Sequence, residues 1–473
     1  MLISTMLLTL AMAGAPIDPL PAVRAGSDSA NEAGAVGRGP AGIAAMRSPE
    51  IQAAEALLNA GDIAGARKKL AEAQEKDPRL AAPGVILARA YLAQKQVPQA
   101  RAELEEVVAK SPQDPEPYAL LGELAWRERR VAETDLLFRQ ALACAKGMEG
   151  SAERKADAEA QAHAGLATVA EARGQWEAAF EELTAWAALD ARNPFPHQRL
   201  GAALHHLGKR EEAIAEFETA GKLNPDFTAE LALATLDEEA GDRKNSAKAI
   251  AAAIKRLPDN LALRRAVANF YVESRQVLLA RRQIEAALKI DPKSVETLVQ
   301  AAGIARLEGD DAAAERRLTA VLEQAPTHFA AINLLALTLA DQDDAEKQAR
   351  ALELAQQNVE KYPRNSEAIA TLGWALLRLA RWDDANRVLR QALATGTVNA
   401  DGAYFLARLF EHLGETGDTK RLLSMALATK RPFAYQAQAE KMLAELNGDG
   451  AKEPAPAGPA EKPAATPKAK KAK

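Results

Sequence analysis

The chain has 473 residues, of which 4% are aromatic, and a formal net charge of −5 at pH 7. So few aromatic residues, in a composition dominated by Ala, Leu, Glu, Lys, Gln and Arg, favour a purely helical protein and argue against sheet-based architectures. The slight acidity argues against a basic body that binds nucleic acid, and no apolar run reaches the roughly 20 residues that a membrane-spanning helix needs.

The N-terminal residues resemble a secretory signal peptide. Residues 7–13 are apolar and end in the pattern Ala11-Met12-Ala13, which is typical of cleavage after Ala13. The usual positive charge before the apolar stretch is missing, since the first basic residue is Arg24. We therefore expect a signal peptide over residues 1–13 and export to the periplasm or cell envelope, with a cytoplasmic location as the alternative. No transmembrane helix is expected after signal removal.

Residues 14–48 are rich in Gly, Ala, Pro and Ser and show no helical periodicity, which predicts a flexible linker. They contain Gly37-x-Gly39-x-x-Gly42, the letters of a dinucleotide-binding motif. That motif needs a preceding strand and a following helix, which these residues do not predict, and Pro40 lies inside it. No cofactor is expected.

Prolines that follow helical stretches recur at a fixed interval from residue 78 onward. Consecutive members of the series are 33 or 34 residues apart at several points, and a period of that size indicates a repeat architecture. Two intervals are longer, and they point to extra residues in a connection around 147–157 and in the segment 341–348. The prolines of the series are Pro78, Pro112, Pro225, Pro258, Pro292, Pro326 and Pro363.

Each period predicts two amphipathic helices, most clearly over residues 194–225. Leu200-Gly201 lie in the first helix of this unit, and Gly208 stands where glycine commonly ends a helix. Ala213, Phe217 and Ala220 follow at the i, i+4, i+7 spacing of one helix face. A small residue at the crossing of the two helices would let them approach closely, and a bulky one would cost about 1–3 kcal/mol.

This pattern resembles the tetratricopeptide repeat (TPR) family. The family's bulky, Leu-Gly, Ala, aromatic and Pro positions are seen in Tyr118, Leu121, Gly122, Phe138 and Ala141, and again in residues 371–393. Several units carry Ala in place of the Gly, and Thr134 and Ser246 replace the small Ala, so the volume stays small. The Ala substitutions are at positions 54, 88, 167, 234, 268, 302, 336 and 407.

The resemblance implies an all-α fold, a right-handed α-solenoid of stacked helix-turn-helix units. We expect about eleven repeats plus a capping helix over residues 432–446, together filling residues 49–447. Residues 448–473 are rich in Pro, Ala and Lys, end in KAKKAK, and predict a disordered tail. The tail is either a solvated end or a contact for an anionic polymer or surface.

No constellation of catalytic or metal-binding residues stands out, so we expect a non-enzymatic protein without a metal. Adjacent residues on a helix point in different directions, so His205-His206 do not form a site by themselves. The acidic clusters Asp310-Asp311 and Asp341 to Asp344 fall in turns between helices, which favours helix N-caps and solvated loops over metal sites. Cys144 is expected to be a small buried thiol.

The resemblance places ligands along a concave groove lined by the first helix of each unit. By analogy with the family, the inward candidates for ligand contacts are Arg265, Asn269 and Glu273 in one unit and Trp374 and Arg378 in another. Arg265 and Asn269 resemble half of the family's carboxylate clamp. The next unit offers Glu296 and Val299 where an amide and a cation are needed, so carboxylate capture is not favoured. Trp374 is either an exposed anchor or a packed interior indole.

Taken together, the sequence predicts a scaffold that binds partner protein segments in the groove of a TPR solenoid. The alternative is a cell-envelope component that assists polysaccharide synthesis or export, since some bacterial TPR proteins with a signal-like start serve there. Specific nucleic-acid binding is not expected. The identity of the protein partner is not encoded in any motif.

Overall fold

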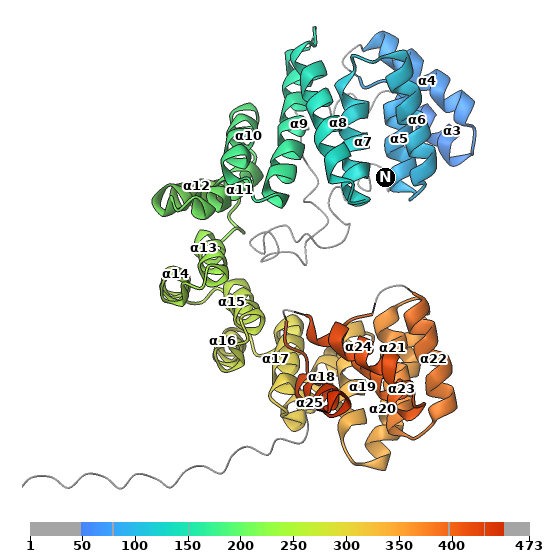
Figure 1. Ribbon diagram of the computed structural model, residues 1–473, viewed down its shortest axis with the longest axis vertical. Coiled ribbons are helices and arrows are strands. Elements are labelled where there is room, and N and C mark those ends of the chain that lie inside the picture. Colours follow the sequence, from blue (N-terminus) through green and yellow to red (C-terminus); the bar gives the residue numbers. More distant parts are fainter. Residues whose placement is uncertain (1–48, 78–79, 150, 396–397, 430, 449–473) are drawn as a thin grey trace, which may run out of the picture. The chain divides into compact units, whose positions relative to one another are not determined.

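The computed structural model describes residues 49–77, 80–149, 151–395, 398–429 and 431–448 (Figure 1). These residues form 23 α-helices and no strand. By their internal packing, they divide into unit 1, which ends at Pro258, and unit 2, which begins at Asp259. The predicted signal peptide (1–13), the linker with its glycine motif (14–48) and the tail from residue 449 lie outside the described residues.

Unit 1 is a stack of six helix pairs in which each helix packs against its successor in the chain. The helices are α3 (Pro49–Asn59), α4 (Ile63–Lys76), α5 (Pro83–Ala93), α6 (Val97–Lys110), α7 (Pro115–Arg127), α8 (Val131–Lys146), α9 (Ala152–Ala172), α10 (Trp176–Leu189), α11 (Pro194–His206), α12 (Arg210–Leu223), α13 (Ala229–Glu239) and α14 (Arg243–Arg256).

Unit 2 has five helix pairs and a final helix. Its helices are α15 (Leu261–Glu273), α16 (Val277–Ile290), α17 (Val295–Leu307), α18 (Asp311–Gln324), α19 (Phe329–Asp341), α20 (Ala345–Lys361), α21 (Ser366–Arg378), α22 (Trp382–Ala394), α23 (Ala400–His412), α24 (Thr416–Leu427) and α25 (Gln436–Asn447). The all-α class and the solenoid-type stacking of helix pairs are confirmed.

The small residues lie where the two helices of a pair approach most closely. A Cβ placed on Gly201 of α11 would come within 2.6 Å of the Phe217 ring of α12, and one on Gly373 of α21 would come within 2.4 Å of Leu389 of α22. Where Ala stands in place of this Gly, as at Ala234 and Ala336, the residue is fully buried. Small volume at this position is therefore a packing requirement of each pair.

A left-handed backbone residue joins the helices of nearly every pair. Glycine fills this position in several turns, as at Gly208 with φ +76°, while Arg129 and Ala380 hold the same region without being glycine. The α19–α20 pair is the exception, because the extra residues 341–344 make a different connection. There Asp344 caps α20 by accepting hydrogen bonds from the backbone N–H groups of Glu346 and Lys347.

Two predicted boundaries are wrong. The extra residues at 147–157 are mostly helix, because Ser151 caps α9 through the N–H of Arg154 and the following Ala-, Glu- and Lys-rich stretch is a strong helix former. The final helix begins at Gln436 and not at residue 432. The residues before it are not helical, and they place Phe433 and Tyr435 in the core.

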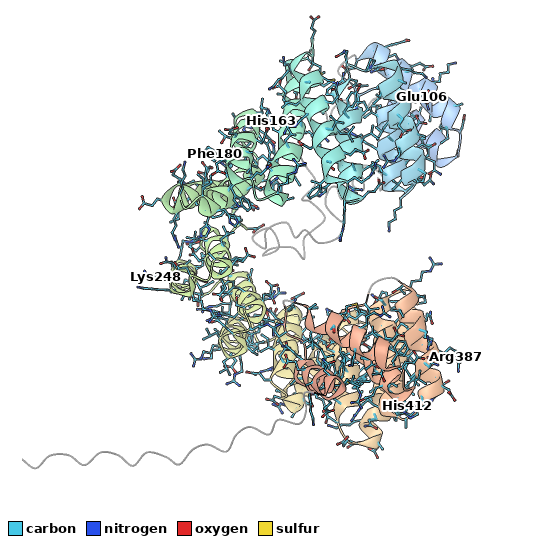
Figure 2. All side chains as sticks on the ribbon, in the orientation of Figure 1. Glu106, His163, Phe180, Lys248, Arg387 and His412 are labelled. Carbon is cyan, nitrogen blue, oxygen red and sulfur yellow. The ribbon has the colours of Figure 1, made fainter. Side chains whose placement is uncertain are left out.

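The two kinds of helix line opposite sides of each stack. Successive first helices contact one another, as α7 does with α9 and α19 with α21, while successive second helices in the described residues share fewer contacts. The first helices therefore form the closer, inner face of each unit. Second helices carry exposed charges on the other side, such as Lys248 of α14 and Arg387 of α22 (Figure 2).

The close approach at Gly201 predicts that Gly201→Ala destabilises unit 1 by about 1–3 kcal/mol, because Phe217 is fully buried and has no room to yield. The matched control is Gly221→Ala in the same helix pair, where the new Cβ would lie 3.6 Å from the nearest atom. That change should be neutral or stabilising by up to about 1 kcal/mol. Urea unfolding followed by circular dichroism measures both variants, and equal stability of the two would contradict the packing argument.

Candidate functional site on the inner faces

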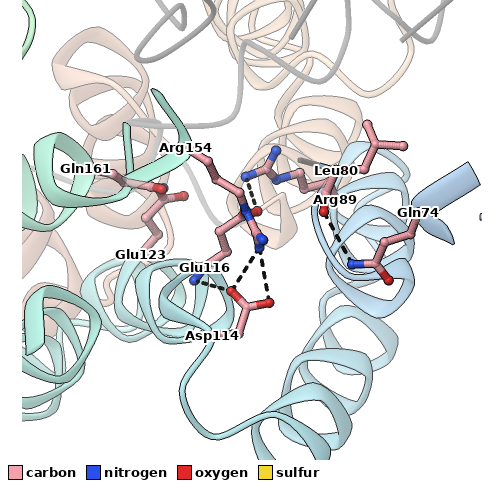
Figure 3. A network of polar contacts seen from close by, with 8 residues as sticks. All are labelled: Gln74, Leu80, Arg89, Asp114, Glu116, Glu123, Arg154 and Gln161. Atoms are coloured by element: carbon pink, nitrogen blue, oxygen red, sulfur yellow. Dashed lines mark hydrogen bonds and ion pairs between the residues drawn. The ribbon is translucent and has the colours of Figure 1, made fainter. Parts of the chain in front are cut away.

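A ladder of ion pairs crosses the inner face of unit 1 from α5 to α9 (Figure 3). Oε1 of Glu116 on α7 accepts a hydrogen bond from Nε of Arg154 on α9 at 2.9 Å. Oε2 of Glu116 lies 3.4 Å from Nη2 of Arg89 on α5. Arg154 also contacts Asp114, the N-cap residue of α7, at 3.3 Å. Burial and the neighbouring Glu116 raise the pKa of Asp114, and Arg154 opposes that rise. Charged side chains therefore hold three successive helix pairs together.

The ladder continues through the rest of unit 1. Arg199 of α11 makes a bidentate contact with Glu171 of α9, at 3.0 and 2.9 Å. His205 of α11 lies 2.9 Å from Asp237 of α13, which is buried. Bidentate and charge-assisted bonds of this kind fix geometry more firmly than single surface pairs. They set the register of neighbouring first helices.

One guanidinium on this face stands apart from the ladder. Arg127 of α7 is half-buried and makes no hydrogen bond or ion pair with any described residue. One turn earlier, Glu123 accepts a hydrogen bond from Gln161 of α9 at 2.9 Å. Burial lowers the pKa of Arg127 and raises that of Glu123. Arg127 is attracted electrostatically to Glu123 but makes no hydrogen bond with a described residue, so its guanidinium donors can still engage an anion.

In unit 2, the first group of predicted ligand contacts lies on α15. Asn269 and Glu273 are exposed, and Arg265 is half-buried. Gln300 of α17 donates its Nε2 hydrogens to the carbonyl oxygen of Arg265 at 2.8 Å and to Oδ1 of Asn269 at 2.9 Å. The amide of Asn269 is thus already joined to the next first helix, and whether any of the three side chains contacts a ligand stays a prediction.

The second group takes part in packing. Trp374 of α21 is 6% exposed, stacks on Phe405 with 4.6 Å between ring centroids and donates its indole N–H to Oδ1 of Asp341 at 2.8 Å. It is the packed interior indole and not an exposed anchor. Arg378 donates to the carbonyl oxygens of Ala340 and Asp341 at 2.9 and 3.3 Å, so it closes the C-terminal end of α19.

The residues that converge in unit 2 were missed from the sequence. Asp341 was expected only as a solvated acidic residue of a turn, but it is the last residue of α19 and the shared acceptor for Trp374, Arg306 and Tyr435. The position of each residue within its repeat could have indicated the cluster, because Arg306, Asp341 and Trp374 all fall at positions that face inward. Tyr435 lies outside the repeats, and no periodicity points to it.

Two carboxyl groups on neighbouring first helices lie beside this cluster: Asp401 is half-buried, and Glu367 is exposed as a residue although its neighbours partly desolvate its carboxyl group. Oε1 of Glu367 on α21 accepts a hydrogen bond from Nδ2 of Asn333 on α19 at 2.9 Å. Burial raises the pKa of Glu367, and the nearby Asp401 of α23 adds to the rise. Burial likewise raises the pKa of Asp401, against the pull of Arg306. This corner of the inner face therefore favours neutral carboxyl groups.

The isolated reactive groups have structural roles. Cys144 is buried, with its Sγ atom 3.5 Å from the carbonyl oxygen of Pro112, and burial raises the pKa of its thiol. His206 stacks on Trp176 with 3.8 Å between ring centroids, and it points away from the partner of His205. In the described part of the chain, no group of three or more His, Cys, Asp and Glu residues could hold a metal ion. No helix there is long and apolar enough to cross a membrane.

Comparison with known proteins gives matches to the tetratricopeptide repeat family at residues 51–124 and 371–418. The first match covers α3 to most of α7, and the second covers most of α21 to the start of α24. Both regions contain the small crossing positions and left-handed turns described above.

A TPR repeat-containing protein of Pseudomonas aeruginosa is 27% identical over 203 residues, which are 42% of this chain and 33% of that protein. The chain thus matches about a third of that relative's length. A solved TPR protein from Parabacteroides merdae is similar with a TM-score of 0.42 and 13% identity, over 54% of this chain and 98% of that one. Yeast Tom70 is similar with a TM-score of 0.37 and 13% identity, over 85% and 95% of the two chains.

The raised pKa of Glu367 predicts a stability that falls as pH rises. The folded state holds the proton more tightly than the unfolded chain, so stability is lost as pH climbs from the ordinary value of 4.5 through the folded-state pKa. Because Glu367 is exposed at the surface, solvent screens much of this effect, so Glu367→Gln should raise the melting temperature at pH 7 by no more than about 1–2 °C. The gain should shrink toward pH 4, as measured by differential scanning fluorimetry.

The control for this prediction is Glu360→Gln, because Glu360 is exposed on α20. It should leave the melting temperature unchanged at both pH values. A Glu367→Gln variant that is less stable than the natural chain at pH 7 would show that the charged carboxylate is needed there.

Proposed function

Because this chain is a tetratricopeptide repeat protein, we propose that it is a protein–protein interaction scaffold and that the inner face of unit 1 binds an extended segment of a partner protein. The observation that carries this proposal is Arg127, a half-buried guanidinium with no bonded partner among the described residues. We propose that it receives a carboxylate of the partner.

The surroundings of Arg127 support this assignment. Ion pairs between α7 and α9 and between α9 and α11 already join the neighbouring first helices, so these side chains are held in place before a ligand arrives. Glu123 lies one turn away and offers an acceptor beside the guanidinium donors. A guanidinium can hold a carboxylate through two parallel hydrogen bonds, and a preformed surface lowers the cost of ordering a flexible segment.

The proposal treats the chain as a binding protein without a reaction of its own. The narrower role in polysaccharide synthesis or export, and the exported location, remain predictions from the sequence of residues 1–13 and the length of the array. Gene neighbours that encode glycosyltransferases or an outer-membrane pore would favour that role over a general scaffold.

A site-specific cross-link tests the proposed face. Gln161 of α9 is half-buried and donates a hydrogen bond to Glu123, one turn from Arg127, so p-benzoylphenylalanine in its place would report on the same part of the inner face. Irradiation of cells that carry the full chain should give a discrete cross-linked product, identified by mass spectrometry. Adding Arg127→Glu should reduce its yield about tenfold or more, because a charge-assisted hydrogen bond becomes a repulsion.

The matched control is Arg139→Glu on α8, a charge reversal on an exposed side chain of a second helix. It should leave the yield unchanged. Circular dichroism confirms that both variants keep their helices. A product that survives Arg127→Glu undiminished would refute this face as the binding site.

A further inference from the structure

The C-terminal segment of unit 2, residues 431–447, packs its helix α25 against α24 and extends Tyr435 to the inner face of its own stack. Tyr435 reaches Arg306 of α17, which is 129 residues away in sequence. Just before this segment, the carbonyl oxygen of Thr429 accepts a hydrogen bond from Arg275, in the turn that follows α15, at 3.3 Å. Phe433, Tyr435, Ala439 and Met442 are buried in one hydrophobic cluster that includes residues of both the first and the second helices from α17 to α24.

The hydroxyl group of Tyr435 sits in a polar cradle, which we define as Arg306, Asp341, Trp374, Asp401 and Tyr404. The hydroxyl donates to Oδ2 of Asp341 at 2.7 Å and accepts from Nη2 of Arg306 at 2.8 Å. Arg306 also contacts Asp341 at 3.1 Å, with only 5% of its own side chain exposed. The phenol thus completes an ion pair in which Arg306 is buried and Asp341 is partly buried.

Three aromatic side chains pack around the ring of Tyr435. It stacks on Tyr404 with 5.1 Å between centroids and an angle of 12° between the planes. Trp374 meets it edge-on at 5.3 Å, and Phe405 does so at 5.2 Å. Offset stacks and edge contacts are the preferred geometries of aromatic pairs. The cradle therefore fits a tyrosine in both its ring and its hydroxyl.

The polar groups of the cradle are not needed merely to hold a capping helix in place. Burying an ion pair is often no better for stability than packing apolar groups of the same size, so such pairs serve specificity more readily than stability. The cradle also retains spare bonding capacity, because Nε of Arg306 and Oδ1 of Asp401 are buried without a hydrogen-bond partner among the described residues. Tyr435 therefore leaves two hydrogen-bonding atoms of the cradle without a partner among the described residues.

From these observations we propose that the cradle is a recognition site for a tyrosine-bearing segment of a partner protein, and that residues 431–447 occupy it as an internal competitor. The cradle residues come from the first helices α17, α19, α21 and α23, the same side of the stack that unit 1 offers to a ligand. A partner segment with a tyrosine, plus polar atoms for Arg306 and Asp401, makes the bonds that the internal segment leaves unmade. This assignment concerns unit 2 and is independent of Arg127.

The test uses the full-length chain and, as the probe, a fluorescent synthetic peptide with the sequence of residues 429–447. The natural chain should bind the peptide weakly, because its own segment fills the cradle. Tyr435→Ala in the chain weakens the internal competitor and should tighten binding about tenfold or more, as measured by fluorescence anisotropy. Tyr435→Phe removes only the hydroxyl and should tighten peptide binding by a smaller factor. This variant replaces Tyr435→Ala in the test if the alanine variant folds poorly.

Control variants distinguish recognition of the tyrosine from non-specific peptide binding. A peptide with alanine in place of its tyrosine should lose binding to the Tyr435→Ala chain, and Lys441→Ala in the chain, an exposed change on α25, should behave like the natural protein. Equal binding of the tyrosine and alanine peptides, or no binding to either tyrosine variant, overturns the proposal. Dimerisation of the natural chain that Tyr435→Ala abolishes also overturns it, because the occupant is then a second copy.

Discussion

The close approach of two helices at a small residue is the constraint on which the rest of this structure depends. Gly122 and Gly165 both face the ring of Phe138, and a Cβ on Gly165 would come within 2.4 Å of it. Each helix pair can nest only because these positions lack bulk, and each pair covers the apolar side of the next. In this way a chain with 4% aromatic residues builds a series of hydrophobic clusters between successive helices of each unit.

The same constraint determines what the inner faces can do. Nesting brings first helices of successive pairs together, so that long polar side chains reach from one to the next, as Arg154 does to Glu116 and Arg306 to Asp341. Within unit 1 these bonds leave Arg127 without a hydrogen-bond partner among the residues that the structure describes. Within unit 2 they build a cradle that a tyrosine of the chain itself fills. One repeat geometry thus yields two surfaces of different chemistry.

Much of the fold could be read from the sequence because its determinants are local. The period of the prolines, the glycine turns and the small crossing residues lie within one repeat, and residues such as Ala268 and Thr134 are fully buried as their spacing requires. The start of α9 was misjudged because a longer repeat interval does not reveal whether its extra residues are loop or helix.

The cradle could not be predicted for a physical reason. Periodicity places Asp341 and Trp374 on the inner face, but their partner Tyr435 lies beyond the last repeat, where no periodic pattern applies. The burial of Trp374 likewise depends on Phe405 and Tyr435, which come from later elements. Long-range contacts from a non-repeating segment are the information that a repeat pattern lacks.

Hydrogen exchange on a Gly373→Val variant tests the central claim most directly, because the new side chain would strike Leu389 at the crossing of α21 and α22. Nearest-neighbour packing predicts that amide protection falls in α19 to α24 while α3 to α12 keep the protection they have in the natural chain. A uniform loss along the whole chain, or no loss around α21, would contradict the account.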